Sequence, residues 1–223
     1  MSLTWALIAA AATVGSVHTL APDHWVPFAA LARAERWSSW RTALVTAACG
    51  LGHVTASVAL GLLALVFGLE LLQTFGHRLE SLAGWLLMGF GVAYGTWGVH
   101  RSLAARAHAH AHLHGHLHAH VHAHDASASH RPLTAWTLFV LFSADPCVAV
   151  IPLLFAAAPL GWASTATIVI AYEASTIGTM VLLVLPTRAA ARRVTGSWAD
   201  RWGDALAGAV VATIGIAVTW LGI

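Results

Sequence analysis

Charged side chains are scarce in this sequence: only 9% of its 223 residues are charged, and every basic residue is an arginine. Soluble domains carry about a quarter charged residues, so the composition excludes a water-soluble globule. Basic residues exceed acidic ones by only two. No dense basic surface is left for a phosphate backbone, which excludes nucleic acid as a partner.

Cysteine is also scarce. Cys49 and Cys147 lie in separate apolar stretches, a pattern that supports neither a disulfide framework nor a Cys-x-x-Cys zinc or redox site. We expect both thiols to be packing residues. The residues in excess are apolar ones, which make up 58% of the chain, and histidine, of which there are fifteen.

Long apolar runs predict an all-α membrane protein. A helix needs roughly 20 apolar residues to cross a bilayer core of about 30 Å. The first run starts without a basic region and outlasts a signal peptide, so we expect a membrane helix there as well. The predicted transmembrane helices are six: Leu3–Leu31, Thr42–Leu69, Leu79–Val99, Leu133–Ala158, Ala163–Leu185 and Ala205–Ile223.

An internal repeat divides the chain into two halves. The segment from Glu80, ESLAGWLLMGFGVA, aligns without gaps with the segment from Asp204, DALAGAVVATIGIA. Three helices per half require an inverted second half, a 3+3 architecture typical of transporters. The alternative is that Gly and Ala are common in any packed membrane helix. The predicted units are a first repeat over 1–100, a disordered His-rich loop over 101–131 and a second repeat over 132–223.

The first and fourth helices each combine an acidic residue with prolines. Asp23 follows Pro22, and Asp145 precedes Pro146, with one further proline in each helix. Proline cannot donate to the carbonyl four residues back, so we expect both helices to be broken there. Irregular backbone at mid-membrane depth is tolerated only where protein or a wet cavity covers it.

The arginines predict the orientation. Those near helix ends are retained on the cytoplasmic side, and only Arg78 lies on the other face. We therefore expect an integral protein of the cytoplasmic membrane with both termini outside and the loop over 101–131 in the cytoplasm. The connections after the first, third and fifth helices carry the other ten: Arg33, Arg36, Arg41, Arg101, Arg106, Arg131, Arg188, Arg192, Arg193 and Arg201.

The first helix contains the pattern H-x-x-x-x-D-H, formed by His18, Asp23 and His24. An acid at the centre of a membrane helix costs about 2.5 to 3.5 kcal/mol, so it seldom persists without a partner or a task. Asp23 lies roughly 15 Å from Arg33 at the membrane edge, at 1.5 Å per residue. The same count puts His53 of the second helix at a similar depth.

These four residues are a candidate metal site. A straight helix would point His18 and His24 about 120° apart, so their convergence requires a bend at Pro22, which would also free the carbonyl of His18. Three imidazoles and a carboxylate suit nickel, cobalt or zinc better than magnesium or calcium. The alternative is structural, because His and Asp on facing membrane helices also hold bundles together.

Three residues of the second half are weaker candidates. Asp145 and Glu173 fit a gating role, a structural role or metal contact. Cys147 offers a thiolate, although a small buried hydrophobe describes it better.

Histidine alternates with other residues throughout the middle of the third loop. Nothing there offers a core, so we expect disorder. Neutral imidazole predominates near pH 7, and the tract is predicted to capture transition metals without choosing among them. Drift of composition in an alanine-rich chain is the alternative. The tract consists of His108, His110, His112, His114, His116, His118, His120, His122 and His124.

The segment His18–His24, followed on the next helix by GLGHVT over 50–55, resembles the nickel/cobalt transporter (NiCoT) family and related nickel and cobalt exporters and urease-accessory membrane proteins. The resemblance is close over these two motifs and loose over the six-helix hydropathy. It implies that His18, Asp23, His24 and His53 contact the transported ion. Pro22 and the His-rich loop are more similar to the exporter and urease-accessory branches.

The sequence therefore predicts a secondary transporter, not an enzyme, that moves nickel or cobalt, with zinc as an alternative cargo and no other cofactor. Its expected partners are the lipid bilayer and the metal ion. A membrane metalloenzyme stays open but would need more histidines within the helices, and a thiol-redox membrane protein would use Cys49 and Cys147. Gly91 and Gly95 suit packing within one bundle as well as a homo-oligomer.

Overall fold

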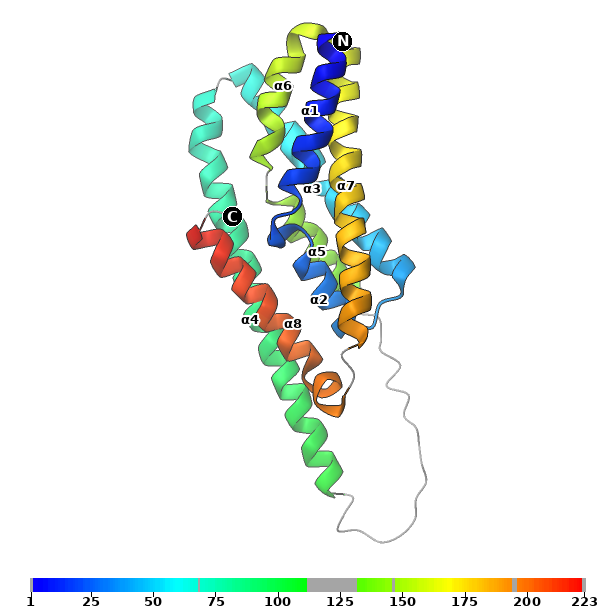
Figure 1. Ribbon diagram of the computed structural model, residues 1–223. Coiled ribbons are helices and arrows are strands. Elements are labelled where there is room, and N and C mark those ends of the chain that lie inside the picture. Colours follow the sequence, from blue (N-terminus) through cyan, green and yellow to red (C-terminus); the bar gives the residue numbers. More distant parts are fainter. Residues whose placement is uncertain (1, 68, 112–131, 146, 194–195, 222–223) are drawn as a thin grey trace.

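The computed structural model describes residues 2–67, 69–111, 132–145, 147–193 and 196–221 (Figure 1). All regular structure in these ranges is helical, which confirms the predicted all-α class. The elements are α1 (Leu3–His18), η1 (Pro22–His24), α2 (Val26–Ala34), α3 (Ser39–Phe67), α4 (Leu69–Ala111), α5 (Pro132–Ser143), η2 (Val148–Val150), α6 (Ile151–Ala157), η3 (Ala158–Leu160), α7 (Trp162–Arg193) and α8 (Ser197–Leu221).

The helices are those of a membrane protein. Among the described residues, four are long and apolar enough to cross a bilayer: α3, α7, the Ser81–Ala104 part of α4 and the Arg201–Trp220 part of α8. A fifth span is formed if α1 and the segment Pro22–Ala34, bent by 83° relative to each other, are taken together. Many large apolar side chains on the outside of the bundle are exposed, as lipid contact requires.

The predicted fourth helix, Leu133–Ala158, corresponds to two short helices. α5 has 12 residues and α6 has 7, or roughly 18 Å and 10 Å of helix at 1.5 Å per residue. Neither crosses a membrane core of about 30 Å alone. Helix lengths therefore give four or five spans, one or two fewer than the six predicted from hydropathy.

The third predicted helix is longer than its apolar stretch. α4 begins at Leu69 and continues to Ala111, so assigning residues 101–111 to the disordered loop is wrong. Alanine and arginine, both strong helix formers, continue the helix where the apolar residues end. Of the predicted loop, residues 112–131 lie outside the described residues.

The helices pack as two groups (Figure 1). α4 and α8 lie side by side, while α1 and α3 both pack against α7, and α5 packs against α3. α2 contacts both α7 and α8 and so joins the groups. Two apolar clusters form the core, and on α3 Cys49 belongs to one cluster and Val54 to the other. His53 lies between these positions, where the two clusters meet.

One end of the bundle is joined by polar contacts. The Tyr94 hydroxyl lies 2.9 Å from a Glu35 carboxylate oxygen and 3.3 Å from one of Asp204, and Arg101 pairs with Asp204 at 2.8 Å. At the same end, Arg188 donates to Ser39 and to the carbonyl of Trp37. These contacts connect the end of α2 and the start of α3 with α4, α7 and α8.

Glycine permits the close approach of α4 and α8. A methyl group added at Gly91 would lie against the backbone of Ala212 and 2.8 Å from the carbonyl oxygen of Gly208. One added at Gly84 would lie 3.3 Å from the carbonyl oxygen of Gly215. Larger residues at this seam would force the helix backbones apart.

We therefore expect Gly91→Val to lower the free energy of unfolding by about 1–3 kcal/mol or more, the usual cost of overpacking. Gly89→Val is the matched control, because a methyl group at Gly89 meets nothing within 4 Å. Thermal unfolding of the two purified variants in detergent checks this, and equal melting temperatures would contradict the close packing of the seam.

Candidate metal centre

The break in the first apolar span positions two of the candidate ligands. α1 ends at His18, and the Thr19 hydroxyl donates to the carbonyl of Gly15 at 2.6 Å. The 3-10 helix η1 then begins with Pro22 and carries His24 as its last residue. The expected freeing of the His18 carbonyl is not found, because the chain turns sharply enough for the Ala21 N–H to donate to it at 3.2 Å.

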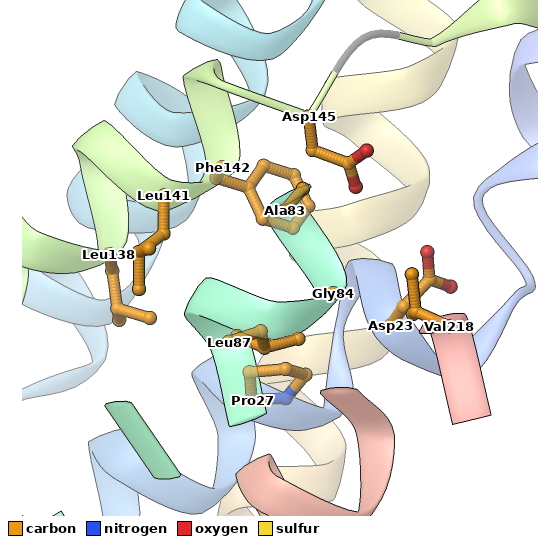
Figure 2. A pocket seen from close by; sticks show the side chains of 10 residues that line it. All are labelled: Asp23, Pro27, Ala83, Gly84, Leu87, Leu138, Leu141, Phe142, Asp145 and Val218. Carbon is orange, nitrogen blue, oxygen red and sulfur yellow. The ribbon is translucent and has the colours of Figure 1, made fainter. Parts of the chain in front are cut away.

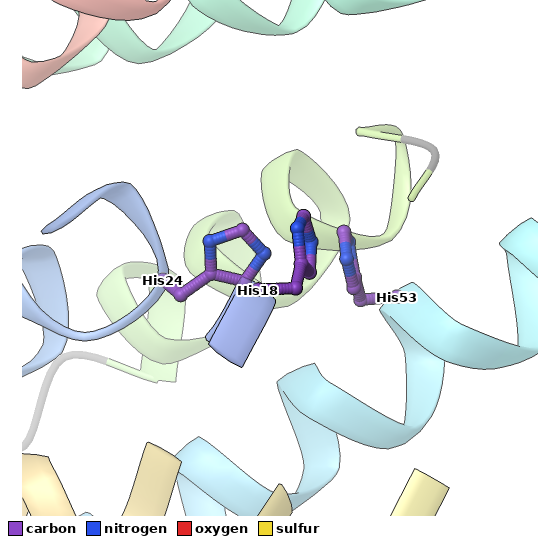
Figure 3. A group of neighbouring side chains, drawn as sticks. All are labelled: His18, His24 and His53. Atoms are coloured by element: carbon purple, nitrogen blue, oxygen red, sulfur yellow. The ribbon is translucent and has the colours of Figure 1, made fainter. Parts of the chain in front are cut away.

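The turn brings His18 and His24 together, and α3 adds His53 (Figure 3). The ring centroids of His18 and His24 lie 4.3 Å apart, those of His24 and His53 5.3 Å, and those of His18 and His53 6.4 Å. His24 and His53 are only 3% and 1% exposed, and His18 is half-buried. The three imidazoles therefore share one largely enclosed place inside the helix bundle.

The imidazole nitrogens there lack hydrogen-bond partners. Nε2 of all three rings and Nδ1 of His24 are buried without one, which is costly for polar atoms away from water. Nδ1 of His53, by contrast, lies 3.1 Å from the carbonyl oxygen of Phe142. Since a carbonyl only accepts, this Nδ1 carries the hydrogen and leaves the Nε2 lone pair available for a metal.

The spacing of the nitrogens suits one ion. Each of His18, His24 and His53 offers a ligand atom, and these atoms lie within 4.8 Å of one another. Two nitrogens bonded to the same ion at about 2.1 Å are at most about 4.2 Å apart. A pair 4.8 Å apart would close by about 0.6 Å for ligands on opposite sides of the ion and by about 1.4 Å for tetrahedral ligands, movements within the reach of side-chain rotation.

Asp23 adjoins this group without belonging to it. Its Oδ1 lies 3.0 Å from Nδ1 of His24, although this contact does not have the geometry of a hydrogen bond. The sequence groups Asp23 with the three histidines, and the structure places it beside one of them. Its carboxylate supplies negative charge at the edge of the imidazole cluster.

The weaker candidates lie outside the histidine group. Asp145 lines a small cavity together with Asp23 (Figure 2). The Cys147 Sγ is buried 2.7 Å from the Tyr172 hydroxyl, and its backbone N–H donates to Ser57. Glu173 is half-buried on α7 with one carboxylate oxygen that has no hydrogen-bond partner.

Neither cysteine belongs to the cluster of His18, His24 and His53. Cys49 and Cys147 are free, buried and members of different apolar clusters, as packing residues are. Of the tract, His108 and His110 fall in the last turn of α4. The other seven, His112 to His124, lie outside the described residues.

Sequence reasoning missed Phe142. Its ring lies 5.7 Å from that of His24 and 5.0 Å from that of His53, between ring centroids, and its carbonyl fixes the His53 ring. An apolar residue that acts through its backbone gives no motif. One signal was present: the spacing that aligns Gly84 with Gly208 also aligns His18 with Phe142.

Comparison of the chain with protein-family models, curated proteins and solved structures finds no match.

Proposed function

We propose that this protein is a secondary transporter of divalent transition-metal ions, with nickel or cobalt as the favoured cargo and zinc as the alternative. The observation that carries the proposal is the convergence of His18, His24 and His53 within a membrane bundle, their ligand atoms within 4.8 Å of one another. Three neutral nitrogen donors without sulfur favour these borderline ions over magnesium, calcium or copper(I).

A cluster with few protein ligands suits transport better than permanent binding. Conduction requires that an ion bind favourably enough to enter and weakly enough to leave. Three histidines leave coordination positions for water, and Asp23 beside them offsets part of the ion's charge. In this proposal the resemblance to the nickel/cobalt transporter family applies to these four residues.

Two features support an inverted 3+3 arrangement as the frame of the transporter. The sequence between α1 and α2, which contains a 3-10 helix, has its counterpart between α5 and α6, where η2 lies. In the sequence repeat, Gly84 corresponds to Gly208, and Gly91 corresponds to Gly215. In the structure, Gly84 lies close to Gly215, and Gly91 lies close to Gly208. A two-fold axis exchanges these two approaches. In this frame α5 and α6 together form one broken span, the counterpart of α1 and α2.

We also propose that the end of the bundle carrying Arg33, Arg101 and Arg188 faces the cytoplasm, in keeping with the retention of arginine on that side. The histidine tract would then collect metal ions at the cytoplasmic mouth, and both termini would lie outside the cell. Selectivity belongs to the buried cluster, because a flexible histidine tract follows only the general affinity order of the metals.

The test is metal flux into proteoliposomes that contain a metal-sensitive dye. The purified protein is expected to move Ni²⁺, Co²⁺ or Zn²⁺ and not Mg²⁺, and His24→Ala is expected to lower the rate at least about tenfold, as the loss of an ion contact does. His100→Ala is the matched control, since His100 is exposed on α4 and lies outside the cluster.

Flux of these metals that is the same for the His24→Ala variant and the unmodified protein would show that the cluster is not the transport site. Absence of flux for every metal would overturn the transporter proposal itself.

A further inference from the structure

A small cavity lies next to the histidine cluster. It has a volume of about 20 Å³ and is enclosed by residues of α2, α4, α5 and α8, most of them apolar. Its acidic residues are Asp23 and Asp145 (Figure 2). Asp23 belongs to η1 in the first half, and Asp145 follows α5 in the second. The cavity therefore has one carboxylate from each interrupted segment of the fold.

Phe142 borders both this cavity and the histidines. Its side chain lines the cavity, while the same ring lies 5.0 Å from the ring of His53 and 5.7 Å from that of His24, between centroids. Phe28 packs against it at 4.9 Å and holds it in place. An ion in the cavity and an ion at the histidines would therefore both lie near this ring.

Asp23 borders both places. It lines the cavity and also lies 3.0 Å from His24. Asp23 is only 9% exposed, yet its Oδ1 has no hydrogen-bond partner. A buried carboxylate oxygen in this condition calls for a cation, a proton or an ordered water, because an uncompensated buried charge is expensive.

The size and the ligands of the cavity suit a dication that has lost most of its water. A space of at least about 10–15 Å³ holds one water molecule, so the cavity has room for an ion that keeps little of its water. Carboxylate oxygens bind divalent cations without the nitrogen preference of the histidine cluster. Such a site would bind a divalent cation first, and the imidazoles would then select among the metals.

We propose that this cavity is a second cation position of the transporter, at which the dication is held by Asp23 and Asp145 before or after it passes Phe142 to the histidines. The proposal rests on the function proposed above. It assigns Asp145 to direct contact with the ion and makes Asp23 the carboxylate that the ion touches at both positions.

The experiment locates Co²⁺ in crystals of the full-length protein by anomalous diffraction. Two peaks are expected within the bundle, one among His18, His24 and His53 and one between Asp23 and Asp145. In Asp145→Asn crystals we expect the second peak to be lost and the first to stay. In proteoliposomes, Asp145→Asn should slow Co²⁺ flux about tenfold, and Asp145→Glu should retain most of it. The control is Val140→Leu, an apolar change at an exposed residue of the same helix outside the cavity, which should leave the flux unchanged.

A peak at the histidines with none in the cavity would overturn the second position and leave the proposed function intact. A cavity peak that persists in Asp145→Asn would also overturn it, since Asp145 would then not hold the ion. Absence of any peak at the histidines would count against the proposed function itself.

Discussion

Replacing His53 by glutamine is expected to lower Ni²⁺ and Co²⁺ flux at least about 100-fold, because even the loss of a residue that only orients a metal ligand costs 10- to 100-fold. Glutamine has a similar volume, and its amide can donate to the Phe142 carbonyl as the His53 Nδ1–H does. The variant keeps the helix contacts but lacks the imidazole nitrogen that faces His18 and His24.

Flux into proteoliposomes and the melting temperature in detergent are measured on the same preparation. A folded His53→Gln protein with no transport supports a metal ligand at this position. A folded variant that transports at the original rate would remove His53 from the site and leave too few nitrogens for selective binding.

Asp23→Asn is expected to reduce transport about 10- to 100-fold and at the same time to raise the melting temperature. Asparagine has the same shape without the charge. A carboxylate buried in a membrane bundle is costly even with His24 at 3.0 Å, so neutralising it is expected to relieve part of that cost. Gain of stability with loss of activity is typical of a group kept for function.

The structural interpretation of the H-x-x-x-x-D-H motif predicts the opposite result. If Asp23 mainly holds His24 in place, Asp23→Asn breaks a buried pair and destabilises the bundle. Asp204→Asn is the matched control: this carboxylate pairs with Arg101 at 2.8 Å and lies near the Tyr94 hydroxyl, so its neutralisation should lower the melting temperature. A fall for both variants would favour the structural role of Asp23.

The convergence of the three histidines could be anticipated from the sequence because depth in a membrane can be counted along a helix. His53 and the His18–His24 segment fall at one level by that count, and Pro22 supplies a reason for a bend between the two rings. Hydropathy likewise predicts the all-helical class, since an isolated backbone in lipid must satisfy its own hydrogen bonds.

Helix ends and backbone contacts could not be anticipated in the same way. Hydropathy reports where lipid surrounds the chain, so it ends α4 near Val99 although alanine and arginine carry the helix on to Ala111. It likewise treats Leu133–Ala158 as continuous although α5 stops at Ser143. The part played by Phe142 depends on its carbonyl, and every residue has one. Only a three-dimensional structure distinguishes the carbonyl that meets His53.

In the proposed transporter, that carbonyl would let both halves of the protein influence how strongly the metal is bound. Phe142 belongs to α5 in the second half, whereas His53 belongs to α3 in the first. If the halves move apart to open a route to the aqueous phase, the contact lengthens, and the imidazole loses the acceptor that fixes its tautomer and its tilt. In the proposed transporter, opening would therefore weaken metal binding, and the ion would be released on the side that has just become accessible.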